Sequence, residues 1–162
     1  MKKLFFCLIV TLLLTTNSGV QAQTIERWKV DDLLKYTATS DSALIINFWA
    51  TYCAPCIEEL PYFHTIAEKY KKQKVKLLLV SLDFEEFYPE RIRSFAGKRN
   101  YTAQIVWLDE EKPDYFCPKV DPGWSGAMPA TLFLNPSKGY RRFVEAQLKP
   151  EELEEQIRSM LK

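Results

Sequence analysis

The sequence predicts a single α/β domain in which a central mixed β-sheet carries helices on both faces. Two continuous apolar runs, 43–49 and 75–82, are typical of strands buried on both sides. Each run is followed by apolar residues at helical spacing, and this alternation favours parallel strands. Two later apolar segments, 130–134 and 140–146, flank the turn sequence NPSKG and predict an antiparallel hairpin. A chain of 162 residues is long enough for one such domain.

Strands and helices alternate along most of the chain before the hairpin and a last helix. Asp31 or Asp32 can cap the first helix, because a carboxylate there accepts hydrogen bonds from the first turn. Pro150 suits the first turn of the last helix. Prolines and glycines between residues 112 and 128 predict a loop with at most one helical turn. The predicted elements are, in order, strand 25–28, helix 32–36, strand 43–49, helix 55–72, strand 75–82, helix 89–99, strand 103–108, strands 130–134 and 140–146, and helix 150–161.

The first 22 residues have the features of a secretory signal peptide. The chain starts with two lysines, residues 4–14 are apolar apart from one threonine, and the sequence VQA that ends at Ala22 fits a cleavage site. The apolar stretch is too short to span a bilayer as a mature helix, and an uncleaved membrane anchor is the alternative. We therefore expect an exported, periplasmic domain made of residues 23–162.

Cleavage after Ala22 would change the charge and the cysteine count. Loss of Lys2 and Lys3 takes the basic residues from 22 to 20 against 21 acidic ones, a formal charge of −1. A nearly neutral domain without a basic stripe gives no electrostatic reason to expect binding to nucleic acid or to an anionic membrane. Three cysteines would remain, which are Cys53, Cys56 and Cys117, so at least one thiol lacks an intramolecular partner.

Cys53 and Cys56 lie between a predicted buried strand and a predicted helix. A structural zinc site normally needs four ligands, and only Cys117 and His64 could add to the pair. A structural disulfide that closes so short a loop would stabilise the fold little. A thiol in the first turn of a helix meets unpaired N–H groups and the positive end of the helix dipole, which lower its pKa. The position favours a redox pair, in which Cys53 attacks a partner disulfide and Cys56 resolves the mixed disulfide.

Two motifs then resemble a known family. The sequence WATYCAPC at 49–56 resembles the thioredoxin active-site motif, and MPAT at 128–131 resembles the cis-proline loop of that fold. The resemblance covers residues 23–162, and it implies a thioredoxin fold with a short N-terminal extension. Within the thioredoxin-like superfamily, the stretch 47–61 is most similar to the exported thiol–disulfide oxidoreductases of the TlpA/ResA type.

The resemblance implies roles for individual residues. Glu59, one helical turn after Cys56, would be a partly buried carboxylate that exchanges the Cys56 proton, unless it is a solvated helix residue. Asn47 stands where thioredoxin itself has a buried aspartate and cannot take a proton, which gives Glu59 more weight. The residues expected along the substrate are Trp49, Tyr52, Pro55, Met128 and the cis-proline Pro129. Trp49 could equally be a core residue, and Pro129 an ordinary turn proline.

The predicted function is that of an exported thiol–disulfide oxidoreductase. The Ala-Pro pair between the cysteines resembles reducing members of the family, so a reductase is favoured. The alternatives are a disulfide oxidase or isomerase, a thiol peroxidase, and a non-catalytic Cu(I)-binding module. We expect no metal, and no cofactor other than the Cys53–Cys56 disulfide. Disulfide-containing exported proteins are the expected substrates, with apocytochrome c one candidate by analogy, and a membrane thiol donor would recharge a monomeric protein.

Two further side chains have open interpretations. Cys117 is either a small buried side chain that packs as a hydrophobe or the site of a regulatory or intermolecular disulfide. His64 is expected to be an exposed residue of helix 55–72.

Overall fold

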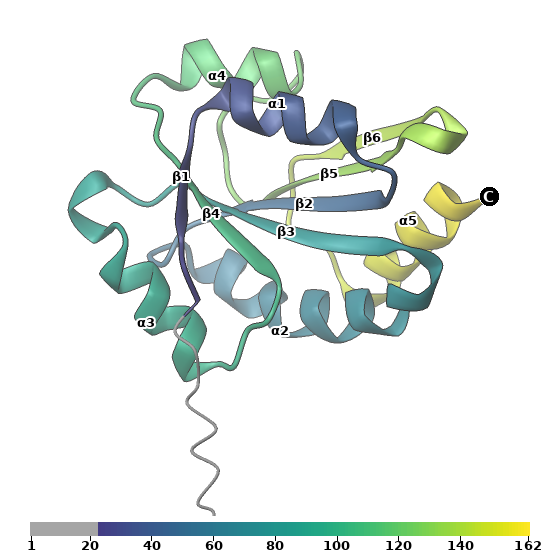
Figure 1. Cartoon of the computed structure of the whole chain (residues 1–162), viewed down its shortest axis with the longest axis horizontal. Coiled ribbons are helices and arrows are strands. Elements are labelled where there is room, and N and C mark those ends of the chain that lie inside the picture. The colour runs from purple at the N-terminus through teal and green to yellow at the C-terminus, as the bar shows by residue number, and fades with distance from the viewer. Residues whose placement is uncertain (1–22) are drawn as a thin grey trace, which may run out of the picture.

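The computed structural model describes residues 23–162. The predicted signal peptide and its cleavage site after Ala22 lie outside these residues. Within them one six-stranded sheet has helices on both faces, as predicted (Figure 1). The elements are β1 Glu26–Trp28, α1 Val30–Thr39, β2 Ala43–Trp49, α2 Ala54–Lys69, β3 Val75–Ser81, α3 Glu90–Lys98, β4 Gln104–Leu108, α4 Pro113–Val120, β5 Ala130–Asn135, β6 Tyr140–Val144 and α5 Pro150–Leu161, with 3₁₀ turns at Lys71–Gln73, Glu85–Phe87 and Pro136–Lys138.

The sheet has the strand order β1-β4-β3-β2-β5-β6. The first four strands in this order run parallel, whereas β5 runs antiparallel to β2 and β6 antiparallel to β5. This arrangement confirms the mixed sheet that the sequence predicts. The central strand β2 is buried over its whole length, as its continuous apolar run indicates. Its carboxyl end leads directly to Cys53, so the best-buried strand positions the cysteine pair.

Two cores lie on opposite sides of the sheet because successive side chains of a strand point to opposite faces. Ile45 and Trp49 of β2 join the core under α2, α3 and α5. Leu44 and Phe48 join the second core, under α1 and α4. Figure 1 shows these two layers of helices above and below the sheet. No helix of residues 23–162 has both the length and the apolar character that crossing a membrane requires.

The structure corrects the expected start of the first helix. Helix α1 begins at Val30 with Lys29 as its N-cap, two residues before the predicted start. Asp32 still caps the helix, but from its third position, where its carboxylate accepts a hydrogen bond of 2.9 Å from the Lys29 N–H.

The structure also corrects the predicted loop 112–128, because residues 113–120 form helix α4. A proline is compatible with the first turn of a helix, so Pro113 starts α4 rather than preventing it. Phe116, Cys117 and Val120 are buried at helical spacing and hold α4 against the sheet. The predicted loop rested on the prolines and glycines of this segment and did not take this apolar spacing into account.

Candidate redox site

The cysteine pair lies at the junction of β2 and α2 and forms a disulfide. Cys53 is the N-cap of α2, and its carbonyl accepts the first hydrogen bond of the helix from the Ile57 N–H at 3.0 Å. Cys53 is half-buried, whereas Cys56 is fully buried. Cys53 is therefore the sulfur that a partner can reach, and Cys56 lies behind it. Pro55 occupies the first turn of α2, where its missing N–H removes no helical hydrogen bond.

Glu59 is fully buried one helical turn after Cys56, so it is not a solvated helix residue. Its Oε1 accepts a hydrogen bond of 2.7 Å from Asn47 Nδ2, and its Oε2 accepts one of 3.0 Å from the Leu148 N–H. Burial raises the pKa of Glu59 to about 7, although the hydrogen bonds from Leu148 and Asn47 oppose this shift. Residues three apart on a helix face the same side, so Glu59 lies on the same side of α2 as Cys56.

Asn47 links Glu59 to the strand that follows the proline motif. Its Nδ2 also donates to Thr131 Oγ1 in β5 at 3.0 Å, and Asn47 is itself fully buried. Its Oδ1 has no hydrogen-bond partner within residues 23–162. The position that carries an aspartate in thioredoxin therefore holds Glu59 in place here instead of supplying a proton acceptor.

The proline motif lies at the start of β5, beside the end of β2, where Phe48 pairs with Ala130. The Met128–Pro129 peptide bond is cis. Pro129 is buried and Met128 is half-buried. Met128 and Cys53 pack against the same core, which contains Cys56. The pairing of β2 with β5 therefore brings together two motifs that lie far apart in the sequence.

The loop before Met128 is held by hydrogen bonds to both backbone groups of Ala127. The Ala127 N–H donates to Glu145 Oε1 at 2.9 Å, and the Ala127 carbonyl accepts from Trp124 Nε1 at 3.0 Å. Glu145 also accepts hydrogen bonds from the N–H and the hydroxyl of Ser125. Trp124 is buried against Phe48, with 4.5 Å between the ring centroids. This anchor was not predicted from the sequence.

Trp49 has no exposed surface and is a core residue. Its position in β2 turns it toward α3, where its ring centroid lies 5.0 Å from that of Phe95. The second of its two interpretations therefore holds, and the structure corrects the expectation that Trp49 lies along the substrate. Tyr52, in contrast, is 43% exposed directly before Cys53.

A second segment, not predicted from the sequence, supports the residues before Cys53. Asp83, which follows β3, is only 4% exposed. Its carboxylate accepts hydrogen bonds from the Thr51 N–H at 3.1 Å, from the Thr51 hydroxyl and from Ser81 Oγ at 2.7 Å. The Tyr52 ring stacks on the exposed ring of Phe84. An acidic residue at the carboxyl end of a buried strand next to β2 was the signal available in the sequence.

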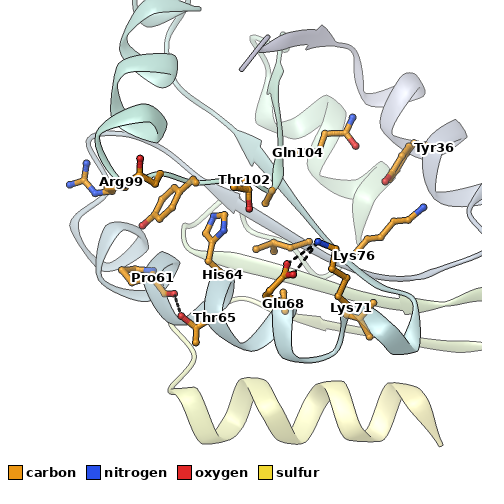
Figure 2. Close-up of a pocket in the computed structure, with 16 residues that line it drawn as sticks. Tyr36, Pro61, His64, Thr65, Glu68, Lys71, Lys76, Arg99, Thr102 and Gln104 are labelled. Atoms are coloured by element: carbon orange, nitrogen blue, oxygen red, sulfur yellow. Dashed lines mark hydrogen bonds and ion pairs between the residues drawn. The ribbon is translucent and has the colours of Figure 1, made fainter. Parts of the chain in front are cut away.

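A cavity of the described chain lies away from the cysteine pair, against the middle of α2 (Figure 2). It has a volume of about 800 Å³, and neither Cys53 nor Cys56 lines it. His64 lines this cavity and is half-buried, with its ring stacked 4.0 Å from that of Tyr101. Burial lowers the pKa of His64 to about 4. The expectation that His64 is exposed was therefore wrong, because segment 99–104 covers this face of the helix.

Cys117 is a free, buried thiol that is 3% exposed. It packs in the core under α1 and α4, as the first of its two interpretations expects. Within residues 23–162 no group of three or more His, Cys, Asp or Glu side chains is arranged to hold a metal ion.

Comparison with known proteins agrees with this geometry. The family model described as the AhpC/TSA family matches residues 18–138. The chain belongs to the AhpC/TSA family. This membership and the fold together support the resemblance to thioredoxin-like proteins on which the sequence analysis drew.

Relatives of this member of the AhpC/TSA family include proteins named thiol-disulfide oxidoreductase ResA. The protein of that name from Oceanobacillus iheyensis is 30% identical over 112 residues, which cover 68% of this chain and 53% of the relative. The one from Geobacillus kaustophilus is 26% identical over 117 residues, which cover 72% of this chain and 62% of the relative. The chain thus spans between half and two thirds of the length of these relatives.

Solved structures establish the fold. A thioredoxin family thiol:disulfide interchange protein from Chlorobium tepidum TLS matches with a TM-score of 0.63 at 15% identity, over 78% of this chain and 85% of that one. StoA from Bacillus subtilis matches with a TM-score of 0.57 at 24% identity, over 74% of this chain and 84% of that one. This member of the AhpC/TSA family therefore has a thioredoxin-like fold.

Proposed function

We propose that the protein is an exported thiol–disulfide oxidoreductase that reduces disulfides in partner proteins through Cys53 and Cys56. The observation that carries the proposal is the position of the pair: an accessible cysteine caps α2, a buried cysteine lies one turn further in, and a buried carboxylate follows after another turn. The names of the ResA relatives support the same activity.

The reaction follows from this order of residues. In the reduced protein the Cys53 thiolate attacks one sulfur of the partner disulfide, a mixed disulfide forms, and the other partner sulfur leaves as a thiolate. Cys56 then gives up its proton and attacks the Cys53 sulfur, which releases the second partner thiol. Two electrons have passed to the partner, and the Cys53–Cys56 disulfide is the oxidised product. A dithiol donor at the membrane would reduce it again.

Glu59 is the proposed acceptor of the Cys56 proton. Its pKa of about 7 leaves a large ionised fraction at neutral pH, so the carboxylate can take a proton and later return it. If so, Glu59→Gln slows the second step, and the mixed disulfide with a partner persists roughly 10²-fold longer than in the parent protein. Glu58→Gln is the matched control, because Glu58 neighbours Glu59 on the same helix but is not buried.

Substrate binding is proposed for the surface around Cys53. Tyr52 and Pro55 lie on either side of Cys53 along the chain, and Pro129 directly precedes β5, which pairs with β2. Met128 takes part in no backbone hydrogen bond of the turns and loops in residues 23–162, so its N–H and carbonyl can pair with an extended partner segment. Exported disulfide proteins, with apocytochrome c as one candidate, are the proposed substrates of a monomer in the periplasm, to which the signal peptide would direct the chain.

Reduction of insulin disulfides by the protein, with dithiothreitol as electron source, tests the proposal. We expect turnover that Cys53→Ala abolishes, whereas Cys56→Ala stops after one mixed disulfide. Cys117→Ala is the matched control and should retain turnover. Activity that survives loss of Cys53 would overturn the proposal, and turnover of peroxide in place of insulin would favour a peroxidase.

The reduction potential of the pair tests the direction of electron flow. Thioredoxin lies at about −270 mV and the oxidant DsbA at about −120 mV. Equilibration with thiol–disulfide buffers should give a value nearer the first. A value near the second would make the protein an oxidase or isomerase.

A further inference from the structure

Two exposed aromatic rings stack on each other beside Cys53. Among residues 23–162, Tyr52, Phe84 and Tyr115 are the large apolar side chains that stand exposed, at 43%, 57% and 49%. Tyr52 and Phe84 have ring centroids 5.1 Å apart and planes within 10° of parallel. Isolated exposed apolar residues are ordinary on a protein surface. Tyr52 and Phe84, however, form one stacked aromatic surface next to Cys53, so this explanation does not apply to them.

Hydrogen bonds fix the backbone of the two segments that carry this pair, which follow β2 and β3. The Leu82 N–H donates to the Trp49 carbonyl at 2.8 Å, and the Asp83 carbonyl accepts from Trp107 Nε1 at 2.7 Å. The buried Asp83 carboxylate holds Thr51, the residue before Tyr52. These hydrogen bonds fix the backbone directly before Phe84, and the Phe84 ring is exposed to solvent. Preorganisation of this kind is what a contact surface requires.

The surroundings of the pair define its chemistry. Phe87 lies next to Phe84, with 6.1 Å between their ring centroids. The Arg91 guanidinium lies over the Phe87 ring, 4.2 Å from its centroid. Glu85 and Glu86 are exposed directly after Phe84. Glu85 lies within 3.4 Å of Arg27, and Glu86 has no ion-pair partner in the described part of the chain. The pair thus presents apolar ring surface next to one unpaired carboxylate, that of Glu86, while Arg27 pairs with Glu85 and Arg91 lies over Phe87.

We propose that Tyr52 and Phe84 form a docking ridge for the partner segment whose disulfide Cys53 attacks. The ridge binds an aromatic or aliphatic side chain close to the attacked cysteine, and it favours a basic residue beside that side chain because of Glu86. The geometry supports this occupant because Tyr52 directly precedes Cys53, so a chain that brings its sulfur to Cys53 passes the ridge. The inference rests on the proposed thiol–disulfide exchange and names the class of substrate that this exchange accepts.

Peptides with one reducible bond test the ridge directly. Two peptides of identical sequence carry a single cysteine as the mixed disulfide with thionitrobenzoate, and they differ by Phe or Ser two residues from that cysteine. Protein reduced beforehand with dithiothreitol attacks the peptide sulfur, thionitrobenzoate leaves as a coloured thiolate, and Cys56 then releases the peptide thiol while the Cys53–Cys56 disulfide forms. The readout is the ratio of the two second-order rate constants within one protein variant.

We expect the Phe peptide to react faster than the Ser peptide by roughly three- to tenfold, the range that one aromatic contact supplies. Phe84→Ser should bring this ratio close to one. Tyr115→Ser is the matched control, because it removes an equally exposed ring from α4, on the opposite face of the sheet from α2, and it should keep the ratio. A lysine beside the Phe should react faster than a glutamate there, and Glu86→Gln should reduce that difference.

A ratio near one in the parent protein, or a ratio that survives Phe84→Ser, would overturn the ridge. Either result is distinct from failure of the proposed function, in which the reduced protein would release thionitrobenzoate from neither peptide faster than dithiothreitol does alone. The ratio also separates the ridge from a folding defect, because a variant that folds poorly loses both rates together.

Discussion

The amide of Asn47 donates a hydrogen bond of 2.7 Å to the carboxylate of Glu59, and neither side chain is exposed to solvent. Burial of a carboxylate without a cationic partner favours its neutral form. The two donors, Asn47 and Leu148, favour the ionised form. These opposing effects leave the pKa of Glu59 at about 7, where both forms are populated. Rotation of the Asn47 amide would turn its unpartnered Oδ1 into an acceptor for the protonated carboxyl.

Glu59→Gln should change how stability depends on pH. The pKa of Glu59 is raised from 4.5 to about 7 on folding, so the folded state binds this proton more tightly than the unfolded state. The stabilisation from this proton is complete below about pH 4.5 and is lost as the pH rises through about 7, at a cost of about 3 kcal/mol. We expect Glu59→Gln, which cannot ionise, to gain stability relative to the parent protein across that range.

Urea unfolding at several pH values measures this effect. Glu58→Gln serves as control, since Glu58 is not buried and its loss should leave the pH dependence of the parent protein unchanged. If the stability of the Glu59→Gln variant follows that of the parent protein at every pH, Glu59 titrates in its ordinary range in the folded state.

Asp83→Ala should destabilise the residues before Cys53. It leaves the buried Thr51 N–H without its acceptor, together with the hydroxyls of Thr51 and Ser81. Unpaired buried donors cost about 1–3 kcal/mol each, and we expect a loss of about 3 kcal/mol in the free energy of unfolding. Asp83→Asn should cost about 1 kcal/mol, because its carbonyl still accepts one hydrogen bond and the hydroxyls can rotate to accept others.

The comparison of these two Asp83 variants by urea unfolding separates lost hydrogen bonds from lost volume. Thr51→Val gives a further control, because it keeps the N–H and the shape but removes the hydroxyl. If Asp83→Ala stays within about 0.5 kcal/mol of the parent protein, the usual effect of a surface substitution, the carboxylate does not support this segment.

Local patterns in the sequence were sufficient to predict the sheet and the position of the cysteine pair. The apolar run of β2 predicts a buried strand, and the position of Cys53 after it follows directly. Glu59 was also within reach, because helical spacing places it on the side of Cys56. The sequence shows Asp83 as an acidic residue after a buried strand, but the contacts of Asp83 with Thr51 and of Phe84 with Tyr52 depend on the pairing of β2 with β3. His64 was misjudged for the same reason, because its cover comes from Tyr101, a residue far along the chain.

Glu145→Ala should loosen the loop that precedes the Met128–Pro129 bond. The hydrogen bond from the Ser125 hydroxyl, together with those from the Ser125 and Ala127 N–H groups, lowers the pKa of Glu145. We expect the Ser125 and Ala127 amides to exchange hydrogen roughly tenfold faster in the variant, while most strand amides keep their protection. Because the pKa is lowered on folding, the anchor is complete above the ordinary value of 4.5 and is lost as the pH falls below it.

Glu145→Gln is the control for this prediction, since its amide oxygen can still accept one of the backbone hydrogen bonds. It should give exchange rates between those of the parent protein and Glu145→Ala. Equal exchange in all three proteins would show that Trp124 alone holds the loop.

Cys117 should resist modification in the folded protein although its thiol is free. Burial raises the pKa of Cys117 to about 11, and the charges of Glu145 and Asp114 add to the shift, so only about one molecule in a thousand carries a thiolate there at about pH 8. The side chain is also 3% exposed. We expect iodoacetamide to label Cys53 of the reduced protein and to reach Cys117 only in urea, as followed by peptide mass spectrometry. Labelling of Cys117 at the rate of Cys53, or a covalent dimer that Cys117→Ala cannot form, would instead favour the regulatory disulfide.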